Sequence, residues 1–100
     1  MRQFTTPEQT AKLVELGFEK PRCATMFWRD NKEVTEINYT IGELISFLLD
    51  DGVSDRRLEF DGFHWIVDWD SFDKIHQTMH VELVDALYDM CVKLKEEGAI

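Results

Sequence analysis

LEFDGFHWIVDW, residues 58–69, has the clearest β-hairpin pattern in the sequence. Asp61-Gly62 is a pair typical of a tight β-turn, and apolar or aromatic residues alternate with polar ones on both sides of it. Because successive side chains of a strand point to opposite faces, this alternation predicts a β-hairpin with one buried face. The set expected to face the helices is Phe63, Trp65, Val67 and Trp69, and the opposite set is His64, Ile66 and Asp68.

Upstream of this hairpin, the sequence predicts two capped helices that flank another hairpin. Thr6 and Thr40 each stand three residues before a Gln or Glu, which is the capping-box pattern that starts a helix. Turn-forming residues at 30–32 separate two runs of residues that favour or pack well on a sheet. The predicted elements are a helix over residues 7–16, strands Ala24–Arg29 and Glu33–Tyr39, and a helix over residues 41–49 that Asp50-Asp51-Gly52 ends.

Downstream, the sequence predicts a long final helix. Apolar residues recur every three or four positions over Leu83–Leu94, Thr78 is the expected N-cap, and Gly98 closes the helix. Ser71–Gln77 is compatible with either a loop or a short helix. The predicted fold is a single α+β domain over residues 1–100, with element order α-β-β-α-β-β-α. Its two hairpins are expected to join in one antiparallel sheet of about four strands packed against helices.

The chain is strongly acidic, with twenty Asp and Glu against eleven Lys and Arg and a net charge of −9. Such a field repels phosphate, so neither a nucleic acid nor an anionic membrane surface is an expected partner. The charge favours a basic protein surface, or it only keeps the protein soluble. Cys23 and Cys91 have no metal-type spacing, and the sequence has no apolar signal core and no run of transmembrane length. These features indicate a cytoplasmic protein.

The negative charge is concentrated in the second half of the chain. Residues 1–50 carry a charge of −2 and residues 51–100 a charge of −7. Carboxylates that alternate with aromatic residues suit the docking of a cationic protein patch. They are equally what a half-buried hairpin requires, with solvated outer positions and aromatic inner ones. The predicted partner-binding surface is the acidic stretch over residues 50–73, with Asp61, Asp68, Asp70 and Asp73 as its expected contact residues.

Histidine and aspartate positions raise an alternative hypothesis, a small metal-binding protein or enzyme. His76 and His80 are four residues apart, which is the spacing that puts two imidazoles on one helix face. Residues 68–73 are rich in oxygen ligands but lack the Gly and the final Glu of an EF-hand. With no serine elbow and no phosphate-binding loop, we predict no catalytic residue, no cofactor and no enzyme. The alternative site would use His64, His76, His80, Asp68, Asp70 and Asp73.

Both ends of the chain carry a familiar pattern. The chain opens with Thr6-Pro7-Glu8-Gln9 and a first helix that leads into Leu16-Gly17-Phe18, and it closes with a Leu-rich helix over residues 83–97 that follows Thr78. In these features it resembles small uncharacterised proteins of Bacteroidales genomes and their phages or mobile elements. The resemblance covers the two ends and not the middle of the chain. It implies no known activity and no site residues.

These observations favour a non-enzymatic accessory or interaction protein of a mobile element that uses its acidic surface. A sharper form of this hypothesis is an inhibitor or DNA mimic that occupies a basic surface. Homo-oligomerisation is a third hypothesis. Seven Phe and three Trp are many for one small core, and surplus aromatic side chains often anchor interfaces.

Overall fold

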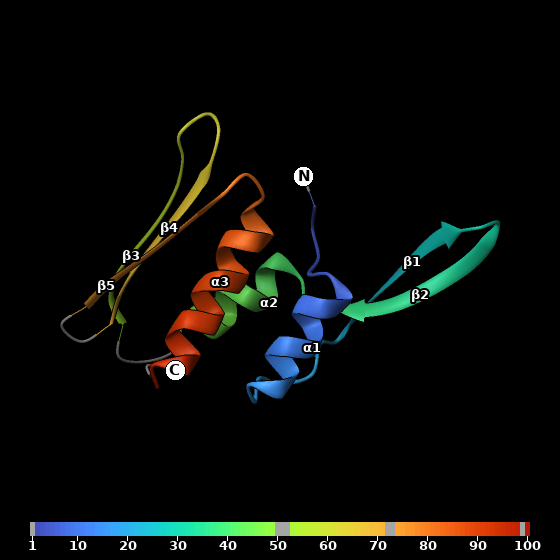
Figure 1. Cartoon of the computed structure of the whole chain (residues 1–100), viewed down its shortest axis with the longest axis horizontal. Helices are drawn as coiled ribbons and strands as arrows, with labels where there is room; N and C mark the ends of the chain where they lie inside the picture. Colours follow the sequence, from blue (N-terminus) through green and yellow to red (C-terminus); the bar gives the residue numbers. More distant parts are fainter. Residues whose placement is uncertain (1, 50–52, 72–73, 99) are drawn as a thin grey trace.

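The protein is described by a computed structural model that covers residues 2–49, 53–71, 74–98 and 100 (Figure 1). In chain order its elements are α1 (Pro7–Glu15), β1 (Cys23–Arg29), β2 (Lys32–Asn38), α2 (Ile41–Leu48), β3 (Val53–Phe60), β4 (Trp65–Ser71), β5 (Lys74–His80) and α3 (Leu83–Glu96). The predicted α+β class is confirmed, with antiparallel strands and helices packed against a sheet. The predicted single sheet of about four strands is wrong. The described strands form two sheets, one of β1-β2 and one of order β3-β4-β5.

Both predicted capping boxes are present. The hydroxyl of Thr6 accepts a hydrogen bond from the backbone N–H of Gln9 (3.1 Å), and the Gln9 side chain accepts one from the N–H of Thr6 (3.0 Å). Thr40 and Glu43 make the same pair of hydrogen bonds at the start of α2. These contacts satisfy N–H groups that have no partner inside a helix, and so fix where each helix begins. Among the described residues, no helix is long and apolar enough to cross a membrane.

The sequence of Ser71–Gln77 is compatible with either a loop or a short helix, but in the structure a strand begins within this segment. Residues 74–80 form β5, which pairs antiparallel with β4 and brings Val67 opposite Thr78. Thr78 is therefore not the N-cap of the final helix, as predicted, because it lies within β5. Its buried hydroxyl donates a hydrogen bond to the carbonyl oxygen of Ala86 (2.7 Å). The final helix begins at Leu83, after Glu82, whose side chain makes no capping hydrogen bond.

The hairpin of β3 and β4 has a longer loop than the predicted turn. Residues 61–64 join the two strands, and the Asp61 carboxylate accepts hydrogen bonds from the N–H groups of Phe63 (2.8 Å) and His64 (2.7 Å). Phe63 is consequently 78% exposed in the loop, so its predicted place on the buried face is wrong. The rest of the predicted inner face does turn towards the helices, with Trp65 partly buried and Val67 and Trp69 buried.

Helix α3 is the centre of the hydrophobic core. It packs against α2, β4 and β5, and its stripe of buried residues is Leu83, Val84, Ala86, Leu87, Met90, Cys91 and Leu94. Burial raises the pKa of the Cys91 thiol to about 12, which agrees with the packing role predicted for this residue. Within the described residues, β3 contacts β4 but no helix. The helices therefore cover only two of the three strands of this sheet (Figure 1).

Strands β1 and β2 form a two-stranded arm, residues 23–38, that extends away from the other elements (Figure 1). Asp30 and Asn31 turn the chain at its tip, both with positive φ (52° and 61°), within the turn that the sequence predicted. The arm touches the other described elements only where β2 meets α1. Its projection accounts for the elongated shape of the molecule, 50 × 33 × 17 Å.

Candidate protein-binding surfaces

Asp68, one of the four predicted surface aspartates, projects from the side of β4 that faces away from the helices. Its carboxylate lies 3.0 Å from the guanidinium of Arg57 on β3 and accepts a hydrogen bond from the Gln77 side chain on β5 (2.8 Å). Arg57 also contacts Glu59 (3.2 Å). The Asp68 side chain is only 21% exposed, and its charge is compensated within the sheet. It is therefore less available to a cationic partner than the sequence suggests.

Asp61 lies apart from Asp68, in the loop between β3 and β4. The N–H groups of His64 and Phe63 stabilise its carboxylate and hold its pKa below the usual 3.8. Asp61 is exposed and ionised near neutral pH, as the predicted surface requires. The side chain of Asp70 and all of Asp73 lie outside the described residues. The four-aspartate surface therefore stays a prediction.

The three histidines do not converge on a common point. His76 and His80 share one face of β5, but four residues along a strand separate them by about 13 Å. The helical spacing predicted for this pair is therefore wrong. Each of the two rings lies near a different carboxylate. The ring of His80 contacts Asp89 of α3. The largely buried ring of His76 lies 3.0 Å from the Glu97 carboxylate but makes no hydrogen bond of suitable geometry with it. The described residues contain no cluster of three or more potential metal ligands.

A groove of about 240 Å³ lies between α2 and β3. Its lining residues are Ile45, Leu49, Arg56, Arg57, Leu58, Trp69 and Leu87. Leu58 (45% exposed) and the nearby Phe60 (51%) stand on the face of the sheet that Val67 and Trp69 bury. They remain exposed because no described helix covers β3. Most of the side chains that line this groove are apolar, Arg56 and Arg57 also line it, and it is open to solvent.

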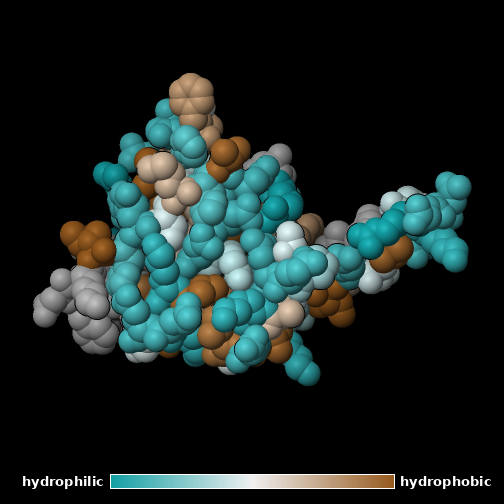
Figure 2. Space-filling model, in the orientation of Figure 1, coloured by the Kyte–Doolittle hydropathy of each residue, from teal (hydrophilic) through white to brown (hydrophobic). Residues whose placement is uncertain are grey.

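The arm presents a second exposed apolar surface. In Figure 2 the projecting part of the molecule is mostly teal and white, with small brown patches. Met26 (66% exposed), Trp28 (74%) and Ile37 (55%) share one face of the arm, because Met26 pairs with Thr35, Trp28 with Glu33, and Ala24 with Ile37 across the two strands. We refer to Met26, Trp28 and Ile37 as the arm face. The sequence predicted these strands but gave no sign that their side chains would be exposed.

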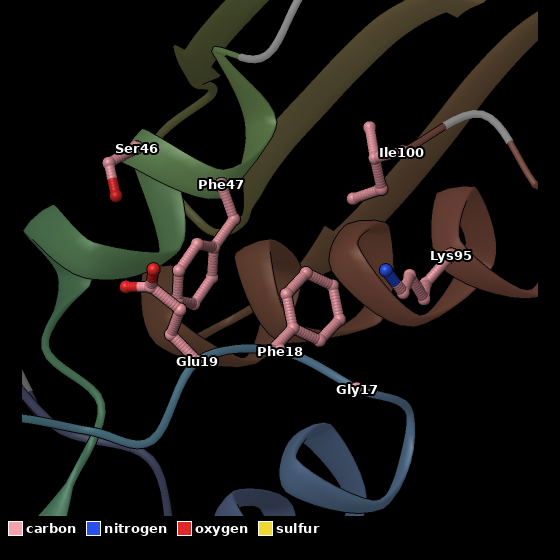
Figure 3. A pocket seen from close by; sticks show the side chains of 7 residues that line it. All are labelled: Gly17, Phe18, Glu19, Ser46, Phe47, Lys95 and Ile100. Atoms are coloured by element: carbon pink, nitrogen blue, oxygen red, sulfur yellow. The ribbon is translucent and has the colours of Figure 1, made fainter.

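A third concave region lies between the end of α1 and helices α2 and α3 (Figure 3). It has a volume of about 340 Å³, and its floor is the contact between Phe18 and Phe47, whose ring centroids are 4.9 Å apart. The ammonium group of Lys95 lies 5.2 Å from the Phe18 ring centroid, a cation–π contact. Tyr39 packs edge-on against Phe47 and donates a hydrogen bond to the carbonyl oxygen of Glu19. Through these contacts the residues that follow α1 pack against α2 and α3.

No protein-family model matches the chain, nor does any curated protein sequence or solved structure.

Proposed function

We propose that the protein is a non-enzymatic protein-binding module and that its binding surface is the groove beside β3. The observation that carries this proposal is the position of Leu58 and Phe60. Both stand on the helix-facing side of the sheet, yet about half of each side chain is exposed. Contiguous apolar surface left open on a soluble protein is typical of a site where another molecule docks.

The backbone of β3 offers a second means of recognition. β3 is an edge strand of its sheet, and no other described strand pairs with its outer edge. Its pairing with β4 is irregular between Val53 and Arg56 and regular from Arg56 to Phe60. Regular edges of this kind accept an additional strand from a partner. An extended partner segment beside residues 56–60 would place alternate side chains in the groove against Leu58.

The charge of the chain defines the chemistry of the partner. Seven of the nine net negative charges belong to residues 51–100, and Asp61 directly follows the exposed Phe60. The partner segment should therefore alternate apolar residues, which enter the groove, with basic residues. The net charge of −7 on residues 51–100 attracts those basic residues, although Arg56 and Arg57 line the groove itself. This proposal keeps the basic partner that the sequence predicts, and Asp61 lies in the loop that follows β3, three residues after Leu58. Asp68 is on the opposite side of the sheet and is expected to contribute little.

The proposal can be tested by selecting peptides from a random library on the immobilised protein. We expect enrichment of sequences in which apolar and basic residues alternate, and we expect binding to weaken as salt is added. Leu58→Ser should weaken the selected peptides about tenfold, because it removes an apolar anchor from the groove. Ile75→Ser is the matched control, since Ile75 is an equally apolar and more exposed residue (76%) elsewhere in the same sheet.

Two results would overturn the proposal. One is the enrichment of acidic peptides, or of peptides without alternation. The other is a set of peptides that bind Leu58→Ser and Ile75→Ser equally well.

A further inference from the structure

The arm has a structure that needs a partner. A two-stranded hairpin is marginally stable in water unless one of its faces packs against something else. Here the only contact of the arm with the other described elements is near its base, between β2 and α1. The three large side chains of the arm face are each more than half exposed. The arm therefore carries apolar side chains that nothing within the described chain covers.

The distribution of charge indicates which partner suits this face. Residues 23–38 contain two basic and three acidic side chains, a net charge of −1, while the rest of the chain carries −8. A second copy of the chain would be repelled by contact with residues 51–100, which carry a net charge of −7 and form the three-stranded sheet and α3. The arm extends away from the strongly acidic sheet and α3, and Glu33, opposite Trp28, is the one charged side chain of β1 and β2 on the side of the arm face. Two copies therefore meet there with less repulsion than at residues 51–100. A basic partner, in contrast, gains little charge attraction from binding the arm, because the net charge of the arm is only −1.

We infer that two copies of the chain pair through their arms, with the arm faces packed together about a two-fold axis. Each face is self-complementary in this arrangement, so Trp28 of one copy packs among Met26 and Ile37 of the other. The two bodies then lie at opposite ends of the paired arms. That separation exceeds the roughly 8 Å over which salt screens charge under physiological conditions. The contact uses a different surface from the groove beside β3 and leaves both grooves open.

The size of the arm sets the expected strength of the pair. Seven residues per strand give a face about 23 Å long, and two strands give a width of about 10 Å. Such a face buries less than the roughly 1,200–2,000 Å² of a standard interface, so we expect a dimer of micromolar affinity. Salt added to a buffer of low ionic strength should strengthen the pair modestly, because the screening length there is long enough for the two acidic bodies to repel each other.

Sedimentation equilibrium of the full chain across the micromolar range tests this inference. We expect a monomer–dimer equilibrium whose dissociation constant rises at least about tenfold in Trp28→Ser, since Trp is the strongest type of interface anchor. Ile75→Ser and Leu58→Ser should leave the equilibrium unchanged. Trp28 lies outside the core, so the melting temperature of Trp28→Ser monitored by circular dichroism should match that of the wild type and exclude misfolding.

A cross-link supplies an independent measurement. In a Cys23→Ser background, Thr35→Cys puts a thiol on the arm face, opposite Met26, whereas Gln77→Cys puts one on the outer face of the other sheet. A short bis-maleimide should join two Thr35→Cys chains and not two Gln77→Cys chains. A monomer at all concentrations would overturn the inference, as would a dimer that Trp28→Ser leaves intact. Loss of the dimer in Leu58→Ser would assign self-association to the groove instead of the arm.

Discussion

The indole N–H of Trp69 donates a hydrogen bond of 2.9 Å to the backbone carbonyl oxygen of Leu48. Leu48 is the last residue of α2, and the carbonyl groups in the last turn of a helix receive no hydrogen bond from within the helix. Both residues are buried, and the bond ties the end of α2 to the middle strand of the three-stranded sheet. Trp69 also lines the groove beside β3, so this bond helps to hold one wall of the proposed binding site.

We expect Trp69→Phe to lower the free energy of unfolding by about 1–3 kcal/mol. The substitution leaves the Leu48 carbonyl without its partner and removes buried apolar surface. Trp65→Phe, at a partly buried position on the same face of β4, is the control and should cost less. Urea unfolding followed by circular dichroism measures both. Equal losses in the two variants would show that the hydrogen bond contributes nothing measurable.

Substitutions of Thr78 can distinguish the strand seen in the structure from the helix N-cap predicted from the sequence. In the structure its buried hydroxyl bonds to Ala86 from within a strand, so Thr78→Val should cost about 1 kcal/mol of unfolding free energy. Thr78→Asn should cost more, because it puts a larger polar side chain, whose amide must find new partners, at a position that is 5% exposed. If Thr78 capped a helix, Asn would be as good as Thr. An asparagine variant as stable as the wild type would therefore contradict the strand assignment.

The Thr78 region shows why part of the fold could not be predicted from the sequence. Helix starts at Thr6 and Thr40 depend on hydrogen bonds between residues three apart, so local sequence identified them. The strand that contains Thr78 depends instead on pairing with β4 and on the cover that α3 gives it. Its sequence, KIHQTMH, mixes polar residues on both faces. The group that Thr78 binds is the Ala86 carbonyl in α3, and the carboxylate near His76 belongs to Glu97, just after that helix. Local pattern carries no information about that contact.

The candidate sites were predictable to a smaller extent. Alternation correctly placed Val67 and Trp69 on the buried side of the hairpin. It could not show that Leu58, on the same side of the neighbouring strand, would lie beyond the reach of the helices. That outcome depends on how many strands α3 covers, which is a property of packing. The exposure of Trp28 has the same cause, because the arm forms a separate sheet instead of joining the larger one.

Tyr39 should make the protein less stable at high pH. Its side chain is buried between helices, and burial, followed by the nearby Glu43 carboxylate, raises its pKa from 10.0 to about 12. The folded state therefore holds this proton more tightly than the unfolded state. The resulting stability is fully present below pH 10 and is lost as the pH rises from 10 towards 12.

The measurement is urea unfolding as a function of pH, together with a spectroscopic titration of tyrosinate. We expect the wild type to lose on the order of 2 kcal/mol over this range because of Tyr39. Tyr39→Phe should be less stable at neutral pH, where it lacks the hydrogen bond to Glu19, and should show a shallower alkaline loss. Burial also raises the pKa of Tyr88, so part of the slope should remain in the variant. An unchanged slope would mean that Tyr39 titrates normally.

The turn at the tip of the arm allows the stability of the arm to be changed without altering the arm face. Asn31 has a φ of 61°, a left-handed conformation that Asn tolerates and Gly adopts freely, whereas a β-branched residue is strained there by about 1–2 kcal/mol. Asn31→Gly should therefore protect the arm amides from hydrogen exchange at least as well as the wild type, and Asn31→Val should expose them.

Because the arm contacts only α1 among the other described elements, neither Asn31 variant should change the global unfolding transition. Asn31→Val should nevertheless weaken the dimer, since an arm that opens more often presents Trp28 less often. A global destabilisation equal to the local one would mean that the arm and the core unfold as one unit. In that case the arm would not need a second copy to be stable, and the main physical argument for arm pairing would be lost.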